Sequence, residues 1–279
     1  MQICRKDGIL YLSFKKKGLI FLELSTALGI PLGLVGVLVG MVLKGANPAM
    51  LLNGASIMII LVGTTGAVLN AMPMHIMKKT PSLIKKVMKR QELMPVPVLA
   101  TTFVEFSQIA RREGLLALEG RLGEIRDPFM KSGMSMMIDG LDAEFIRDVM
   151  EAEVAAMEER HRHCATIFSQ GGMYSPTLGV LGAVIGLVAA LGNLSDVDQL
   201  GISIAAAFIA TMYGIFFGYV VCHPIATKLK ILSQEEAAVK RIIIEGILSL
   251  QAGDSPIAVE SKLNAFLPQA ERKVSTTGE

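Results

Sequence analysis

The fold is decided by residues 171–224, which read GGMYSPTLGVLGAVIGLVAALGNLSDVDQLGISIAAAFIATMYGIFFGYVVCHP. They hold two apolar runs, Gly172–Gly192 and Ile202–His223, joined by the polar link Asn193–Gly201. Neither run contains Asp, Glu, Lys or Arg, and each is about 20 residues long. A helix of that length, rising about 1.5 Å per residue, crosses roughly 30 Å of hydrocarbon. The stretch therefore predicts a hairpin of two membrane-spanning helices.

Small residues recur on both runs at helical spacing: Gly179, Gly182, Ala183 and Gly186 on the first, and Gly214 and Gly218 on the second. Faces of this kind let helix backbones approach closely in lipid, where no hydrophobic force drives association. Hydroxyls on the same runs include Tyr174, Ser175, Thr177, Ser203, Thr211 and Tyr213. Two interpretations are open. The glycines serve helix packing alone, or the hydroxyls line a narrow hydrated passage.

Composition agrees with a membrane protein. The chain has 279 residues, 52% of them hydrophobic, and a mean hydropathy of +0.51, which is too apolar for an ordinary soluble domain of this size. Its net charge of +2 does not indicate a nucleic-acid partner. Cys4, Cys164 and Cys222 are far apart in the sequence, so neither a disulfide framework nor a zinc site is expected.

Charge patterning predicts the topology. Two further uncharged runs, Leu24–Leu43 and Leu51–Met74, precede a basic cluster of Lys78, Lys79, Lys85, Lys86, Lys89 and Arg90. The short connecting loops hold only Lys44, Asp196 and Asp198. By the positive-inside rule, the long loop and both termini are cytoplasmic. The predicted fold class is an all-α integral membrane protein with four transmembrane helices and a large helical cytoplasmic loop between spans 2 and 3.

The expected division of the chain follows from these spans: a basic N-terminal extension at 1–21, spans 1 and 2 at 22–74, a cytoplasmic helical domain at 75–170, the hairpin of spans 3 and 4 at 171–224, and a cytoplasmic helical tail at 225–279. The loop is too long to be a mere connection and should fold.

Helical periodicity runs through both cytoplasmic parts. Val98–Arg112 places Leu99, Phe103, Phe106 and Ile109 at three- and four-residue steps. Asp142 is the expected N-cap of a second helix, with Phe145, Val149 and Ala156 on its apolar face and a continuation into the third span as one rod. In the tail Ile225–Gly253, Leu232, Val239, Ile243 and Leu250 form an apolar face, so the tail should pack against the loop.

The sequence offers no enzymatic motif. It has no Walker loop, no GxGxxG, no GxSxG elbow and no HExxH, and no cofactor is expected. His161-Arg-His163-Cys164 has poor spacing for one metal ion and indicates a solvated helix end instead. All four spans lack Asp and Glu, whereas an ion relay normally needs an ionisable group inside the membrane. If the protein moves ions, another chain must supply the carboxylate; otherwise it moves nothing.

Several long motifs carry a resemblance: ARREGLLALE at 110–119, DGLDAEFIRD at 139–148, YSPTLGVLGAVIG at 174–186, and the pair His223-Pro224. In this order they resemble the MotA family of flagellar motor stator proteins, within the MotA/TolQ/ExbB proton channel family, and the likeness extends from about Leu22 to about Pro268. Relatives begin near the position of Leu22, so residues 1–21 are expected to be an extension or a misassigned start.

The resemblance implies a homo-oligomeric ring of MotA subunits around a MotB dimer in the bacterial inner membrane. The MotB-like partner would supply the membrane carboxylate and the peptidoglycan anchor, and ion flow would change the contact of the loop with the rotor protein FliG. Arg111 and Glu119 match the rotor-facing charges, although by residue type alone they are ordinary solvated ions. Pro176 and Pro224 match the prolines that bracket the hairpin, where they would act as hinges.

The same resemblance indicates the ion. Sodium-driven relatives carry Thr at the place of Ala183, and proton-driven relatives carry Ala, as this chain does. Thr211 alone is too little for a sodium cage, so H+ is the expected ion and sodium the less favoured one. Ala183 and Thr211 are expected to face the partner's carboxylate.

Two other classes of protein compete with a stator subunit. An ExbB- or TolQ-like energiser of envelope transport shares the hairpin, but that family resembles three-span proteins and lacks the motif from Arg111 to Glu119. The other class is a non-conducting membrane scaffold, which would be favoured if co-expression with a MotB-like partner gave no ion uptake.

Overall fold

The computed structural model describes residues 24–88, 93–192 and 194–267, and none of these forms a strand. The N-terminal part contains α1 (Leu24–Leu43), η1 (Pro48–Leu51), α2 (Gly54–Ile57), η2 (Met58–Val62), α3 (Gly63–Ala71), α4 (Met74–Met77) and α5 (Thr80–Met88). The remainder contains α6 (Val96–Glu113), η3 (Leu115–Arg121), α7 (Pro128–Ile138), α8 (Ala143–Leu191), α9 (Val197–Phe216), η4 (Phe217–Cys222), α10 (His223–Gln251) and α11 (Pro256–Asn264). The predicted all-α class is confirmed. The predicted extension at 1–21 lies outside the described residues.

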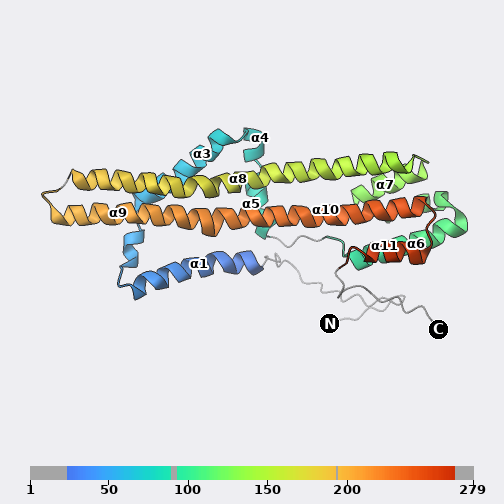
Figure 1. Cartoon of the computed structure of the whole chain (residues 1–279), viewed down its shortest axis with the longest axis horizontal. Coiled ribbons are helices and arrows are strands. Elements are labelled where there is room, and N and C mark those ends of the chain that lie inside the picture. Colours follow the sequence, from blue (N-terminus) through green and yellow to red (C-terminus); the bar gives the residue numbers. More distant parts are fainter. Residues whose placement is uncertain (1–23, 89–92, 193, 268–279) are drawn as a thin grey trace.

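Two long antiparallel rods organise the molecule (Figure 1). One is α8, with 49 residues, which at about 1.5 Å per residue is roughly 70 Å long. The other is the uninterrupted succession of α9, η4 and α10. The Asp142 carboxylate caps α8 by accepting a hydrogen bond from the Glu144 N–H at 2.9 Å. The predicted N-cap and the predicted continuation of this helix into the third apolar run are both confirmed.

The turn between the rods is shorter than predicted. The hydropathy pattern predicts a polar link over residues 193–201, but α9 already begins at Val197. The Asp196 carboxylate accepts hydrogen bonds from the N–H groups of Asp198 and Gln199, both at 3.1 Å, and so starts the helix early. The prediction was wrong because it followed hydropathy and missed this cap.

The end of the rods away from this turn is a helical domain with its own core. The predicted helix over Val98–Arg112 is confirmed as α6, and Leu99, Phe103 and Phe106 are buried. On α10, Ile243 and Leu250 are buried as predicted. Gly246 of α10 lies so close to Phe103 that a Cβ there would be 2.6 Å from the ring. The tail and the loop therefore pack together, as the sequence predicted.

The apolar face predicted for the start of α8 was wrong by one residue. Phe145, Val149 and Ala156 are exposed, whereas the buried positions are Ile146, Met150, Val154 and Met157. Both sets follow helical spacing. The buried set is the one that α7 and α10 cover, and those neighbours come from distant sequence.

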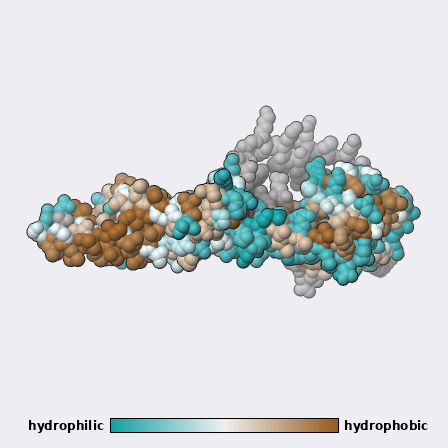
Figure 2. Space-filling model, turned by 90° about the horizontal axis from the view of Figure 1, so that it is seen from above, coloured by the Kyte–Doolittle hydropathy of each residue, from teal (hydrophilic) through white to brown (hydrophobic). Residues whose placement is uncertain are grey.

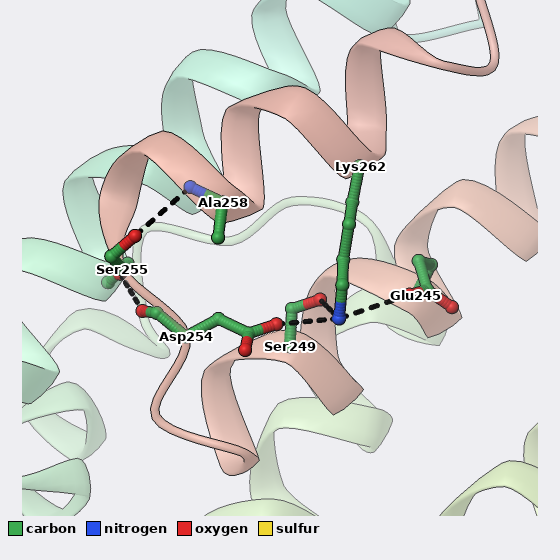
Figure 3. A network of polar contacts seen from close by, with 7 residues as sticks. Glu245, Ser249, Asp254, Ser255, Ala258 and Lys262 are labelled. Atoms are coloured by element: carbon green, nitrogen blue, oxygen red, sulfur yellow. Dashed lines mark hydrogen bonds and ion pairs between the residues drawn. The ribbon is translucent and has the colours of Figure 1, made fainter.

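Polar contacts fasten α11 to the end of α10 (Figure 3). The Lys262 ammonium donates to the Asp254 carboxylate at 2.6 Å and lies 3.8 Å from Glu245. The hydrogen bond from Lys262 lowers the pKa of the Asp254 carboxyl, so the contact stays ionic at neutral pH. Ser255 caps α11 by accepting from the Ala258 N–H at 3.2 Å.

Hydrophobic surface gathers at the hairpin end of the rods, hydrophilic surface covers much of the middle, and the far end shows both kinds (Figure 2). Three helical segments are long and apolar enough to cross a membrane: Gly54–Ala71, part of α8 and part of α9–α10. The apolar part of α1, Leu28–Leu43, is shorter. The count of four spans stays a prediction. The predicted domain borders at 170/171 and 224/225 fall within the continuous rods, so they would mark membrane levels and not breaks in the chain.

Candidate functional site

A seam of small residues joins α8 to α9. A Cβ built on Gly214 would lie 2.6 Å from the Ser175 carbonyl oxygen and 3.0 Å from the Gly179 Cα. Farther along, a Cβ on Gly186 would lie 2.8 Å from that of Ala207. These distances leave no room for side chains, so the glycines serve helix packing, as the first of the two sequence interpretations held.

The hydroxyls along the seam donate to carbonyls of the same chain. Ser175 is fully buried and donates to the Gly214 carbonyl at 3.0 Å. Thr211 lies 3.3 Å from the Gly179 carbonyl oxygen. Tyr213 donates to the Leu51 carbonyl and thereby fixes α9 to η1. These three hydroxyls already have carbonyl partners, and the described glycine contacts close the seam from Gly179 to Gly186.

Ala183 and Thr211 lie at the same level of the seam. Gly182 contacts Ala210, and a Cβ on Gly179 would be 3.2 Å from the Thr211 Cα. Gly182 also faces Ile59 of η2, and the next residue, Ala183, is turned about 100° away from that side. Both predicted ion-path residues are half-buried.

The two predicted hinge prolines occupy different local structures. Pro176 lies inside α8, which continues through it without a break. Pro224 is in the first turn of α10, directly after the wide π-helical turn η4. A proline has no N–H for the carbonyl four residues earlier, and a π turn shifts hydrogen bonding by one residue. The Pro176 ring packs against η4, 3.0 Å from a Cβ built on Gly218.

The predicted rotor-facing charges lie far from the hairpin. Arg111 is in the last turn of α6, and Glu119 is on η3 after the turn at Gly114, where φ is +85°. Both side chains are exposed, and neither forms an ion pair with any described residue. Exposed charges without internal partners are available to another protein.

Polar contacts near the middle of the rods, between His161 and Ser233 and between Lys86 and Glu236, were not predicted from the sequence. The stretch at 161–164 is not a helix end, because α8 runs through it. His161 is half-buried, its Nδ1 lies 3.0 Å from the Ser233 Oγ, and burial lowers the pKa of this imidazole. Nearby, Lys86 pairs with Glu236 at 3.3 Å. Among the described residues, no group of three His, Cys, Asp or Glu side chains could hold a metal ion.

The long uncharged hairpin and the separate helical domain define a class of protein: an all-helical membrane subunit whose spans carry no acidic group of their own. The model of the MotA/TolQ/ExbB proton channel family matches residues 122–241. "Motility protein A" of Bacillus subtilis is 48% identical over 259 residues, which are 92% of this chain and 96% of the relative. "Chemotaxis protein PomA" of Vibrio alginolyticus is 32% identical, over 90% of this chain and 98% of the relative. The chain belongs to the MotA/TolQ/ExbB proton channel family.

Solved structures agree with this membership. A chain of the flagellar MotAB stator complex from Bacillus subtilis superposes with a TM-score of 0.85 at 48% identity, over 90% of this chain and 98% of that chain. A chain of the MotAB complex from C. jejuni gives 0.84 at 33% identity, over 91% and 99%.

Proposed function

We propose that this chain is the stator subunit of a bacterial flagellar motor and forms, with a MotB-like partner, a proton channel whose ion flow drives rotation. The observation that carries the proposal is the match along nearly the whole chain to a flagellar MotAB stator complex. The chemistry agrees, because an ion path beside spans without Asp or Glu needs a carboxylate from another chain.

The proposed assembly is a ring of copies of this chain around a MotB-like dimer in the inner membrane, with both termini in the cytoplasm. The basic residues after the second and fourth apolar runs support this orientation. The MotB-like partner would supply both the peptidoglycan anchor and the acidic group. Torque would pass from the hairpin to the rotor protein FliG along the two rods, whose uninterrupted helices connect the hairpin with the helical domain.

The proposed ion is H+. At the level of Ala183 and Thr211 the hairpin offers one hydroxyl, and that hydroxyl lies within hydrogen-bonding distance of the Gly179 carbonyl. A dehydrated sodium ion needs several oxygen ligands, whereas a proton needs one acceptor and a hydrogen-bonded path. We propose that the partner's carboxylate lies against this level of the hairpin.

Charge reversal at both rotor-facing positions, Arg111→Glu with Glu119→Lys, should slow swimming strongly while membrane abundance stays normal. The single changes Arg111→Ala and Glu119→Lys should each slow it less, because an exposed charge pair contributes only about 1 kcal/mol and mainly steers association. Swimming speed and membrane abundance are measured together, and Lys131→Gln, an exposed change on α7, is the control.

The comparison of the charge-reversal variants with the Lys131→Gln control distinguishes a stator subunit from an energiser of envelope transport, because an energiser does not contact a rotor. Unaltered swimming in the double reversal, at normal abundance, would count against rotor contact by these residues.

A further inference from the structure

His223 is the one imidazole of the two apolar runs 172–192 and 202–223. The other ionisable groups in these runs are the phenols of Tyr174, Tyr213 and Tyr219 and the thiol of Cys222, which ordinarily titrate well above neutrality. Imidazole is the side chain that gains and loses a proton in the physiological range. His223 is the last residue of the second of these runs.

The backbone of α8 makes room for this imidazole. A Cβ built on Gly172 would lie 2.8 Å from both the Cδ2 and the Nε2 of His223. The ring of Tyr219, one turn back along the helix, lies 5.2 Å from the imidazole between centroids, at an interplanar angle of 44°. The imidazole is half-buried and has no hydrogen-bond partner among the described residues.

His223 lies on the same stripe of the second rod as the proposed ion level. Thr211, Ile215, Tyr219 and His223 follow one another at four-residue steps, which keeps them on one helix face. The middle of this stripe is open, with Ile215 50% and Tyr219 62% exposed. The segments α2, η2 and α3 pack on the other side of the hairpin, through contacts such as that of Gly182 with Ile59. On the side of the stripe, α1 approaches η4 and lines a cavity of about 430 Å³ together with Tyr219. The described residues of α1 carry no titratable side chain.

We propose that His223 is the proton acceptor at the cytoplasmic end of the ion path, an inference that rests on the proposed function. The proton leaves the partner's carboxylic acid, passes through water and the Tyr219 hydroxyl along the stripe, and binds a nitrogen of the neutral imidazole. The imidazolium then gives this proton to cytoplasmic water and returns to its neutral form. Twelve residues separate Thr211 from His223, roughly 18 Å along the helix axis, so the path needs water between them.

The groups around His223 suit release to the cytoplasm. On its own rod the nearest titratable side chains are Tyr219 and Cys222 toward the membrane, and Lys228 and Lys230 toward the cytoplasm. Across the seam, α8 presents the backbone of Gly172, with Tyr174 as its nearest titratable residue, and α3 carries none. None of these named groups is a carboxylate, so none of them forms an ion pair that would hold the transferred proton on His223.

The test is the swimming speed of cells whose only stator subunit is a variant of this chain, expressed with its partner at matched membrane abundance. His223→Gln fills the same space but cannot gain a proton near neutral pH, and it should slow swimming at least about tenfold. His75→Gln is the matched control, because His75 is an exposed histidine at the corresponding end of the second apolar run, and it should swim normally.

His223→Glu distinguishes proton transfer from packing. A carboxylate can again accept a proton, so part of the swimming speed should return, with its optimum at lower cytoplasmic pH than in the parent. Normal swimming of His223→Gln would overturn the proposal, and so would equal loss in Gln and Glu variants. If the parent chain itself does not support swimming, the proposed function is wrong. That result differs from a failure of the inference alone, in which the parent chain swims and the His223 variants do not behave as expected.

Discussion

Gly214→Val should abolish swimming and reduce the amount of folded protein in the membrane. The added Cβ would meet the Ser175 carbonyl oxygen at 2.6 Å and the Gly179 Cα at 3.0 Å. Both are backbone atoms of α8, so no rotamer change relieves the clash. The rods would have to separate and lose the hydrogen bond from Ser175 to the Gly214 carbonyl. Overpacking of this kind costs about 1–3 kcal/mol or more.

The matched control is Gly36→Val on α1, where a Cβ has no atom of the described chain within 4 Å. Membrane abundance is measured by immunoblot, and the melting temperature is measured on the detergent-purified complex with the partner. Normal abundance, melting and swimming of Gly214→Val would show that the seam between α8 and α9 is not as close as described.

Pro176→Ala should assemble normally and fail to drive rotation. Pro176 has no N–H for the Gly172 carbonyl, and that oxygen faces Gly218 of η4, 2.8 Å from a Cβ built there. Alanine would restore the missing hydrogen bond inside α8 and remove the ring that packs on the π-helical turn. The place where both rods depart from regular α-helical hydrogen bonding would then become stiffer. We expect folding to be unimpaired and torque to be lost.

Pro31→Ala provides the comparison, since Pro31 is an exposed proline inside an apolar helix, α1. Both variants are compared with the parent for copurification of the partner and for rotation of tethered cells. If tethered cells that carry Pro176→Ala rotate normally, Pro176 has no hinge role and serves only in packing.

The fold was predictable where local chemistry decides it. The absence of charge over 172–192 and 202–223 set the hairpin, and Asp142 set the start of α8. The buried face of α8 was not predictable, because Phe145 and Ile146 fit helical spacing equally well and the choice between them depends on α7 and α10. The early start of α9 depends on a single cap at Asp196.

The candidate site also has features that the sequence predicts and features that it does not. Glycine spacing predicted the seam, but the sequence does not say that Ser175 donates to the Gly214 carbonyl or that Tyr213 donates to the Leu51 carbonyl. The contact of His161 with Ser233 joins residues that are 72 positions apart in the sequence, and no local sequence pattern predicts it. The roles proposed for Arg111 and Glu119 come from family resemblance, because exposure and missing ion pairs are properties of many surface charges.

The central claim is that this chain and a partner carboxylate form a proton path that turns a rotor. The most direct measurement is the swimming speed of a strain that lacks its own stators and expresses this chain with its partner, in sodium-free medium with and without a protonophore. We predict full speed without sodium and an immediate stop when the protonophore is added. Swimming that requires added sodium, or that persists with the protonophore, would contradict the claim.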